Sequence, residues 1–521
     1  MASQRLVAAK LDLAQWCEPV EVAGAGFLNF RLKPSALAQA LREAADGGSL
    51  FFQKTAEPRC VIIDFSSPNA AKPMHVGHIR STILGDALAR ILRLLGHHVI
   101  TDNHIGDWGT QFGKLLVGWK AHLDPERLRA DPIAEMDRLY KLVNGQCESD
   151  PQVLEKARQE LVKLQAGDEE NLRLWREMIA LSQTQFDRVY ARLGVKFDYS
   201  LGESYYNPML KKVVDELTAR GQAQPSEGAM VVSFDDLPEL KDHPALVRKS
   251  DGGYNYTTTD LATLLFRWEG GTWSVRPNEI IYVTGAPQQL HFKQIFAVFH
   301  RWHPEANVKL AHVWFGSVLG EDGRPFKTRS GDTVRLEDLL DEAEERALKV
   351  VAEKNRDLDE ALGREIARVV GLGSIKYADL AQNRQSDYVF SWDRMLALQG
   401  NTAPYLLYAY TRIRSIFRKG GESVVGGAGA FVLTAPEELA LARHLLNFGL
   451  VLDAVAEDYR PNFLCGYLYE LAGHFARFYE NCPVLKGEGA ARATRLGLCD
   501  VTARVLKQGL EVLGIETTEQ M

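Results

Sequence analysis

The segment from Cys60 to Asn103 constrains the fold of this chain more than any other. It consists of an apolar run, CVIIDF, the turn SSPNAAKPMHVGH, an amphipathic stretch over about 79–95 that stops at Gly96, and a second strand-like run, HVITDN. The apolar residues of the amphipathic stretch recur at three- and four-residue spacing, which predicts a helix with one buried face. The order strand, turn, helix, strand predicts a βαβ unit in a parallel, nucleotide-binding sheet.

The turn before this helix carries groups that can bind an anion. The first turn of a helix presents unpaired N–H groups and the positive end of the helix dipole. His75 and His78 would add donors there, Gly77 would let a nucleotide approach the backbone, and Lys72 would supply a mobile cation. The turn is therefore a candidate triphosphate site. Read alone, the histidine pair is better explained as solvated surface. A metal site lacks a third ligand at zinc-like spacing, so no metal is expected.

Composition limits the remaining possibilities. A chain of 521 residues exceeds one hydrophobic core and predicts two to four domains. Its 46% hydrophobic and 25% charged residues are typical of a globular protein, and no membrane partner is expected. The N-terminus lacks the apolar core of a signal peptide, and the six scattered cysteines suit reduced thiols, so we expect a cytoplasmic protein. A net charge of −7 argues against a nonspecific polyanion binder.

Other segments outline the domain organisation. Residues 21–32 alternate like strands, and a short helix is expected over Pro34–Ala45. Residues 120–192 are charged and helical, as expected for an insertion between two halves of the sheet domain. Strand signals return at MVVSF, YNYTTT, EIIYVTG and HVWFGSVLG, and the chain is helical after SGDTVRL. The stretch GGESVVGGAGA predicts a flexible connector. An all-α domain is expected from about residue 400.

Several of these motifs together resemble one enzyme family. SSPNAAKPMHVGH, NHIGDWGTQFGKLL, DGGYNYTTTDLA, YVTGAPQQLHFKQ, GRPFKTRSGDTVRL, KYADLAQNRQSDYVFSWDRML and GNTAPYLLYAYTRIRS are similar, in order and spacing, to class I aminoacyl-tRNA synthetases, and specifically to arginyl-tRNA synthetases. The resemblance implies an α/β Rossmann-like catalytic domain over 49–399, with the helical insertion at about 120–192. It also implies an α-helical anticodon-binding domain of the DALR type over 400–521.

The resemblance implies a two-step reaction. ATP and L-arginine would form arginyl-adenylate, and the arginyl group would pass to the 2′-hydroxyl of the terminal adenosine of tRNA(Arg). Mg²⁺ would accompany ATP. HVGH corresponds to the HIGH motif of the family, so His75, Gly77 and His78 would hold ATP and stabilise the transition state. Adenylation needs no general base, because the arginine carboxylate is already the nucleophile. The catalytic demand is positional and electrostatic.

The second family signature departs from its usual form. Alignment of PFKTRSG on KMSKS places Pro325 at the first lysine and Thr328 at the second, so the lysine that usually neutralises phosphate is missing. Lys72 is the expected replacement, with Lys327 and Arg329 as loop cations. Read alone, PFKTRSG is an ordinary basic turn.

The resemblance also implies an arginine pocket. Glu203, Tyr256 and Asp260 match the family positions that bind the guanidinium, and Asn69 and Gln288 match those that hold the α-amino and carboxylate end. A guanidinium presents five N–H donors and a permanent charge, which carboxylates in a fixed plane can recognise. Without the family, Asp260 could be only a helix cap. Because such a pocket discriminates strongly, we expect no editing activity.

The C-terminal helices should read the anticodon. Basic and acidic residues are nearly equal in number there, so charge alone does not indicate RNA. RNA bases can also stack on aromatic rings and arginine planes. Such groups, many of which are also candidates for the helix core, are Tyr405, Tyr408, Tyr410, Arg412, Arg414, Tyr467, Tyr469, Phe475, Arg477, Phe478 and Tyr479. Residues 1–48 are expected to be a remnant of the family's N-terminal, elbow-binding domain.

Three other functions stay open from the sequence. An HxGH nucleotidyltransferase that adenylylates a small metabolite would share the HVGH turn, but it would not need the arginine pocket or a long helical tail. A non-catalytic tRNA-binding paralogue would usually lose the motif residues. A dehydrogenase is disfavoured because no G-x-G-x-x-G follows the first strand. The preferred reading is an arginine–tRNA ligase that acts as a monomer and requires tRNA(Arg) for arginine activation.

Overall fold

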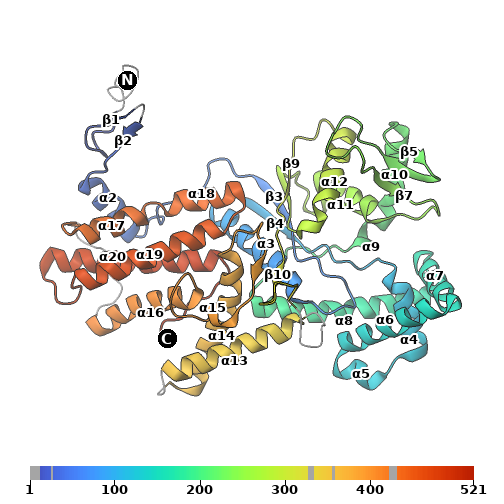
Figure 1. Ribbon diagram of the computed structural model, residues 1–521. Helices are drawn as coiled ribbons and strands as arrows, with labels where there is room; N and C mark the ends of the chain where they lie inside the picture. Colours follow the sequence, from blue (N-terminus) through green and yellow to red (C-terminus); the bar gives the residue numbers. More distant parts are fainter. Residues whose placement is uncertain (1–11, 25–26, 327–333, 355–357, 422–430) are drawn as a thin grey trace. The chain divides into compact units, whose positions relative to one another are not determined.

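A computed structural model describes residues 12–24, 27–326, 334–354, 358–421 and 431–521 (Figure 1). The chain divides into two compact units. The sheet unit contains Ala56–Glu342 and Gln382–Ser391. The helical unit is assembled from Met1–Thr55, Ala343–Ala381 and Trp392–Met521.

A four-stranded parallel sheet forms the centre of the sheet unit, in the order β4-β3-β8-β9. Its strands are β3 (Cys60–Asp64), β4 (His98–Asp102), β8 (Glu279–Tyr282) and β9 (Lys309–His312). Every residue of β3 is buried, as expected for a central strand covered on both faces. The predicted βαβ unit is confirmed, since β3 and β4 are parallel neighbours joined through a helix.

That helix is α3 (Val76–Leu94), which begins three residues earlier than the apolar spacing predicted. The reason is local, because His75 caps the helix with its own side chain. Gly85 lets α3 approach the chain after β3 closely. A Cβ at Gly85 would lie 2.2 Å from Cγ of Phe65. Gly96 follows the helix with a φ of 91°, a left-handed conformation that suits glycine.

Helices alone occupy the predicted insertion between β4 and β8. They are α4 (Gln111–His122), α5 (Pro125–Ala130), α6 (Pro132–Ser149), α7 (Pro151–Gln165) and α8 (Glu169–Leu193). Each of α5, α6 and α7 has an aspartate at the N-cap and a proline at the first helical position. The aspartate satisfies free N–H groups and the proline already has a helical φ, so the repeated Asp-Pro pairs define these helix starts.

The rest of the sheet unit completes its core. It comprises α9 (Glu203–Tyr206), η1 (Asn207–Met209), α10 (Leu210–Ala219), β5 (Gln224–Ser226), β6 (Ala229–Val232), β7 (Ala245–Arg248), α11 (Tyr256–Trp268), η2 (Gly271–Trp273), η3 (Ala286–Gln288), α12 (Gln289–Trp302), β10 (Val318–Leu319) and β11 (Tyr388–Val389). The strand predicted at YNYTTT is wrong, because α11 begins at Tyr256. Asn255 accepts the Thr258 N–H at 3.4 Å and caps this helix, which overrides the β propensity of the threonines.

The helical unit begins with β1 (Glu21–Ala23), β2 (Phe27–Asn29) and the predicted helix α2 (Pro34–Ala45). Its later helices are α14 (Glu360–Leu380), α15 (Trp392–Met395), α16 (Ala403–Gly420), α17 (Pro436–Leu445), α18 (Phe448–Asp458), α19 (Asn462–Asn481) and α20 (Gly489–Val512), and α13 (Leu336–Lys354) runs from one unit into the other. In the part of 400–521 that the structure describes, all elements are helical, as predicted. The expected connector at GGESVVGGAGA falls mostly on 422–430, outside the described residues.

One described stretch, Pro436–Asp458, is long and apolar enough by composition to cross a membrane. It corresponds to α17 and α18, whose apolar side chains are buried within the helical unit at Leu441, Leu445, Phe448, Leu452 and Val455. All six cysteines are unpaired, and five of them are buried, whereas Cys147 on α6 is partly exposed.

Candidate functional site

The N-terminus of α3 is built from the two histidines of HVGH. The Gly77 N–H donates to Nδ1 of His75 at 3.1 Å, and the His75 N–H donates to Nδ1 of His78 at 3.1 Å. The two rings lie 4.0 Å apart between centroids. Because each Nδ1 accepts a backbone hydrogen bond, each neutral ring carries its proton on Nε2. Two N–H donors are therefore available at one helix start.

These two imidazoles are uncharged near neutral pH. Burial, together with the repulsion that a protonated His75 would exert, lowers the pKa of His78 to about 3, against a backbone hydrogen bond that raises it. Burial and the nearby Lys72 ammonium lower the pKa of His75. Positive charge at this turn consequently comes from Lys72 and from the helix dipole, while the histidines supply directed hydrogen bonds.

Chain segments on either side of residues 327–333 are attached to the first turns of α3. The Val76 N–H donates to the carbonyl of Val334 at 3.0 Å. Arg80, one turn further along α3, is buried and donates to the carbonyl of Gly316 at 2.7 Å. Val334, which directly follows residues 327–333, therefore lies beside the HVGH turn, and Gly316 lies beside the next turn of α3.

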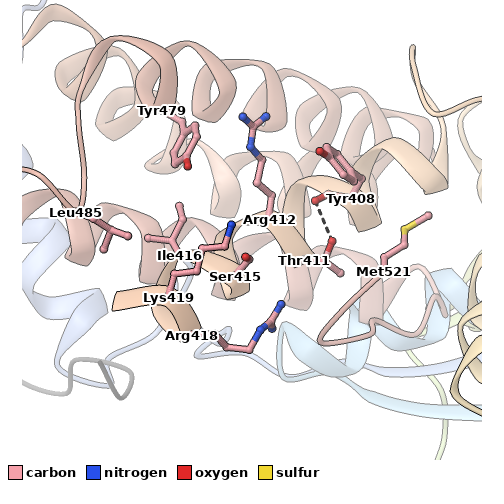
Figure 2. A pocket seen from close by; sticks show the side chains of 10 residues that line it. All are labelled: Tyr408, Thr411, Arg412, Ser415, Ile416, Arg418, Lys419, Tyr479, Leu485 and Met521. Atoms are coloured by element: carbon pink, nitrogen blue, oxygen red, sulfur yellow. Dashed lines mark hydrogen bonds between the residues drawn. The ribbon is translucent and has the colours of Figure 1, made fainter. Parts of the chain in front are cut away.

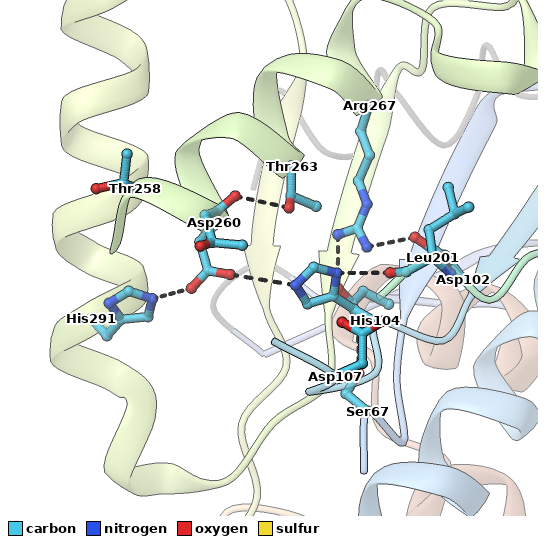
Figure 3. A network of polar contacts seen from close by, with 12 residues as sticks. Ser67, Asp102, His104, Asp107, Leu201, Thr258, Asp260, Thr263, Arg267 and His291 are labelled. Carbon is cyan, nitrogen blue, oxygen red and sulfur yellow. Dashed lines mark hydrogen bonds and ion pairs between the residues drawn. The ribbon is translucent and has the colours of Figure 1, made fainter. Parts of the chain in front are cut away.

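A second group of polar side chains is centred on Asp260 of α11 (Figure 3). Its Oδ2 lies 2.5 Å from Nε2 of His291 on α12. Tyr256, one turn before Asp260 on the same helix, meets the His291 ring edge-on at 4.8 Å between centroids. Since Asn255 is the N-cap, Asp260 is not a helix cap, and its carboxylate is available for another role.

Carboxylates converge on the other side of Asp260. Nε2 of His104 lies 3.9 Å from Oδ1 of Asp260, and Nδ1 of His104 is 3.1 Å from the Leu201 carbonyl (Figure 3). Burial raises the pKa of Glu203, His104 lowers it, and the charges of Asp260 and Asp107 raise it further. Carboxylates that repel one another in a partly buried site favour a cationic ligand, because the ligand relieves the repulsion.

Arg267, on α11, fixes this group to the ends of the parallel strands. It is fully buried, donates to Oδ2 of Asp102 at 2.7 Å, and forms an ion pair with Asp64 at 2.8 Å. Oδ1 of Asp102 accepts the Leu201 N–H at 3.2 Å, and the Leu201 carbonyl contacts His104 (Figure 3). Asp64 and Asp102, the last residues of β3 and β4, thus hold Arg267 of α11, and Asp102 also positions His104 through the backbone of Leu201.

Asn69 lies beside Gly106, which belongs to the same HIGD sequence as His104. The Ala70 N–H donates to the Gly106 carbonyl at 3.0 Å, and a Cβ at Gly106 would lie 2.2 Å from Oδ1 of Asn69. Glycine is required there for Asn69 to keep its place. Gln288 is exposed immediately before α12, one turn ahead of His291.

Comparisons with known protein families identify the family of this chain. A family model described as "tRNA synthetases class I (R), catalytic domain" matches residues 40–392, and one described as "DALR anticodon binding domain" matches 406–521. The chain belongs to the class I arginyl-tRNA synthetase family. The predicted family, its α/β fold with a helical C-terminal domain, and its ligase class are confirmed.

Curated arginyl-tRNA synthetases match over nearly their whole length. The chain is 47% identical to the arginine–tRNA ligase of Synechococcus elongatus, over 98% of this chain and 88% of the relative. It is 45% identical to that of Chromobacterium violaceum, over 99% of this chain and 90% of the relative. Among solved structures, the arginyl-tRNA synthetase of Plasmodium falciparum covers 100% of this chain with a TM-score of 0.84 at 31% identity, and 89% of its own chain is matched.

The arginyl-tRNA synthetase of Thermus thermophilus has the same TM-score of 0.84, at 28% identity, over 100% of this chain and 91% of its own. ATP is a substrate of this enzyme family. No group of three or more His, Cys, Asp or Glu side chains that could hold a metal ion occurs among the described residues.

Most of the predicted site residues of this synthetase lie in two neighbouring groups of the sheet unit. His75, Gly77 and His78 form the first turn of α3, with Lys72 close enough to affect the pKa of His75. The second group contains Asn69, Glu203, Tyr256 and Asp260, and Asn69 lies there against Gly106. Gln288 lies at its edge. Lys327 and Arg329 fall outside the described residues, so their roles stay predictions.

Sequence reasoning missed several residues of the second group. They are Asp102, His104, Asp107, Arg267 and His291. A signal was present for Asp102, which ends an apolar strand as Asp64 does, because polar groups at the carboxyl ends of parallel strands commonly line a site. No local pattern pairs them with Arg267, which lies far along the chain.

The helical unit of the synthetase contains a separate pocket of about 350 Å³ (Figure 2). Its lining residues are Tyr408, Thr411, Arg412, Ser415, Ile416, Arg418, Lys419, Tyr479, Leu485 and Met521. Arg412 lies over the Tyr479 ring at 4.6 Å from the centroid, so a cationic plane and an aromatic ring face one cavity. Of the aromatic residues predicted to bind RNA, four are buried, as expected for helix packing: Tyr410, Tyr467, Phe475 and Phe478.

Proposed function

We propose that this chain is an arginine–tRNA ligase that activates L-arginine with ATP and transfers the arginyl group to the 2′-hydroxyl of the terminal adenosine of tRNA(Arg). The observation that carries the proposal is the pair of Nε2–H donors at the start of α3. In adenylation, an arginine carboxylate oxygen attacks the α-phosphorus, and the bond to the pyrophosphate oxygen breaks. His75 and His78 donate to the phosphate oxygens as negative charge builds there.

Cations near the same turn neutralise the phosphates. Lys72 replaces the lysine that is missing from the second signature, and Lys327 and Arg329 add further positive charge for the phosphates. Mg²⁺ enters as the complex with ATP, because Mg²⁺ is held mainly by water and substrate phosphates. It shields the charge of the departing pyrophosphate.

The carboxylate group around Asp260 selects arginine. Asp260 and Glu203 accept N–H bonds from the guanidinium, and Tyr256 stacks on it or bonds to it. Asn69 and Gln288 hold the α-amino and carboxylate end. An amino acid without the guanidinium would leave these partly buried carboxylates unpaired, so discrimination of about 10⁴-fold needs no editing site.

The C-terminal domain contacts tRNA. Residues 400–521 bind the anticodon loop, with bases stacking against Arg412 and Tyr479 in the pocket of Figure 2. Residues 49–399 form the catalytic domain with its insertion at about 120–192. As in the family, tRNA(Arg) is required for arginine activation.

The protein acts as a cytoplasmic monomer without a membrane partner. Core packing within the helical unit already accounts for the apolar residues of Pro436–Asp458.

Aminoacylation of unfractionated tRNA with each labelled amino acid in turn tests the function. Arginine alone should be incorporated, and His78→Ala should keep the fold but lose most of the rate. Incorporation of a different amino acid, or of none, would contradict the proposal. The HxGH nucleotidyltransferase alternative predicts release of pyrophosphate with a small metabolite and no labelled tRNA.

Two further parts of the proposal, the requirement for tRNA(Arg) and the lack of editing, are each tested by a separate measurement. ATP–pyrophosphate exchange should be negligible without tRNA(Arg), and strong exchange in its absence would refute the tRNA requirement. Mischarged tRNA carrying another amino acid should persist in the presence of the enzyme, whereas its rapid hydrolysis would reveal editing.

A further inference from the structure

Tyr140, on α6 of the helical insertion, lies against the lysine assigned to the triphosphate site. Nζ of Lys72 is 4.9 Å from the centroid of the Tyr140 ring. Two residues separate Lys72 from the HVGH turn, and its ammonium is close enough to lower the pKa of His75. A residue of the insertion therefore contacts a cation beside the paired imidazoles.

A second lysine shares this ring at a longer distance. Nζ of Lys114 is 5.8 Å from the Tyr140 centroid. Its ammonium also donates to Oδ1 of Asn144 at 2.6 Å, and that hydrogen bond fixes its direction. Because Lys72 lies nearer to the ring, the ring restrains the position of Lys72 more strongly than that of Lys114.

The N-cap residue of α6 is tied to the same part of the site. Asp131, its N-cap, accepts from Nη1 of Arg335 at 3.1 Å. The backbone of Arg335 pairs with His75 in an antiparallel bridge. Helix α6 is thus held against the HVGH turn at its N-cap, and Tyr140 follows about two and a half turns later.

An aromatic ring suits the task of holding this lysine. A carboxylate partner would fix Lys72 but would also neutralise it and compete with phosphate. A ring face attracts the ammonium through its quadrupole and adds no formal negative charge, so N–H donors and the positive charge stay available to a phosphate. The phenol hydroxyl is not needed for this interaction.

We propose that Tyr140 is a positioning residue for adenylation, whose ring holds the Lys72 ammonium toward the triphosphate. The helical insertion then supplies part of the compensation for the lysine missing from the second signature. This inference rests on the proposed role of Lys72 in the ligase reaction.

Pyrophosphate exchange in the presence of saturating arginine and tRNA(Arg), with ATP varied, tests the inference. Tyr140→Leu should lower kcat/KM for ATP by about 5- to 30-fold, whereas Tyr140→Phe, which keeps the ring, should stay within about twofold of wild type. In a Lys72→Met background, Tyr140→Leu should cause no further loss. A structural role alone would give neither the rescue by phenylalanine nor this coupling.

Control variants separate the possible failures. Leu142→Ala changes an exposed side chain on the same helix and should leave exchange unchanged. Thermal unfolding of each variant reports loss of fold, and Tyr140→Met replaces Tyr140→Leu if the latter unfolds early. The inference would be overturned if Tyr140→Leu lowered kcat/KM for ATP as much in the Lys72→Met background as in wild type. It would also be overturned if the effect of Tyr140→Leu disappeared in the Lys114→Met background instead. Wild-type exchange by Lys72→Met would refute the role of Lys72, while the ligase reaction itself is tested separately by arginylation.

Discussion

The two histidines of HVGH are uncharged near neutral pH, and for His78 this affects the stability of the fold. The pKa of His78 is about 3 in the folded chain, against an ordinary value near 6.5 when unfolded. Between these values the unfolded state binds more protons, so His78 destabilises the fold as pH falls below about 6.5 and has little effect above it. Lowering the pH from about 7.5 to about 5 should cost up to ~2 kcal/mol through this group.

Urea unfolding at the two pH values, for wild type and His78→Asn, measures that contribution. Asparagine can still accept the His75 N–H but does not titrate, so the variant should lose less stability on acidification by about the same ~2 kcal/mol. His122→Asn, at an exposed position at the end of α4, is the matched control. Equal pH dependence in wild type and His78→Asn would show that His78 is not held neutral.

Gly106→Ala should impair arginine binding through its effect on Asn69. The new Cβ would lie 2.2 Å from Oδ1 of Asn69, so the side chain must move. Loss of a hydrogen bond to a charged substrate group should raise KM for arginine by about 10- to 100-fold, with KM for ATP little changed. Gly145→Ala on α6 meets no heavy atom within 4 Å and should leave both constants unchanged. A normal KM for arginine in Gly106→Ala would remove Asn69 from the pocket.

At the scale of elements, Arg267 joins α11 to the ends of β3 and β4. Arg267→Leu would leave Asp64 and Asp102 buried without their cation, which should lower the free energy of unfolding by about 3–5 kcal/mol. Arg267→Lys keeps the charge but lacks the planar fork that reaches both carboxylates, so it should be intermediate. Urea unfolding followed by tryptophan fluorescence gives the comparison. A loss below about 0.5 kcal/mol for the leucine variant would mean that the ion pairs contribute nothing net.

Local patterns predicted the elements whose causes are local. The apolar spacing of 79–95 and the apolar run at β3 identified the βαβ unit, although the His75 cap starts the helix three residues earlier than that spacing predicted. The Tyr256 segment was misread because strand propensity was weighed without the Asn255 cap. Pairings between distant segments, such as Arg267 with Asp102 or Tyr140 with Lys72, follow from tertiary packing and leave no periodic trace. The family resemblance supplied the pocket residues that spacing alone could not.

At the scale of the whole molecule, tRNA contacts and chemistry are assigned to different units. Arg412→Ala and Tyr479→Ala should each raise KM for tRNA(Arg) by about 5- to 100-fold, the loss expected for one stacked base, without changing KM for arginine. Exchange should recover at saturating tRNA. Arg443→Ala, exposed on α17 outside the pocket, is the control. A raised KM for arginine with normal KM for tRNA would contradict the assignment.

Because five of the six thiols are buried, the remaining one, Cys147, can be labelled selectively. Burial raises the pKa of Cys60 and of Cys482, so these groups resist alkylation, while Cys147 is partly exposed on α6. It lies about two turns beyond Tyr140. A maleimide fluorophore would therefore attach preferentially at Cys147, and its emission would report movement of the insertion as nucleotide is added to the unmutated enzyme.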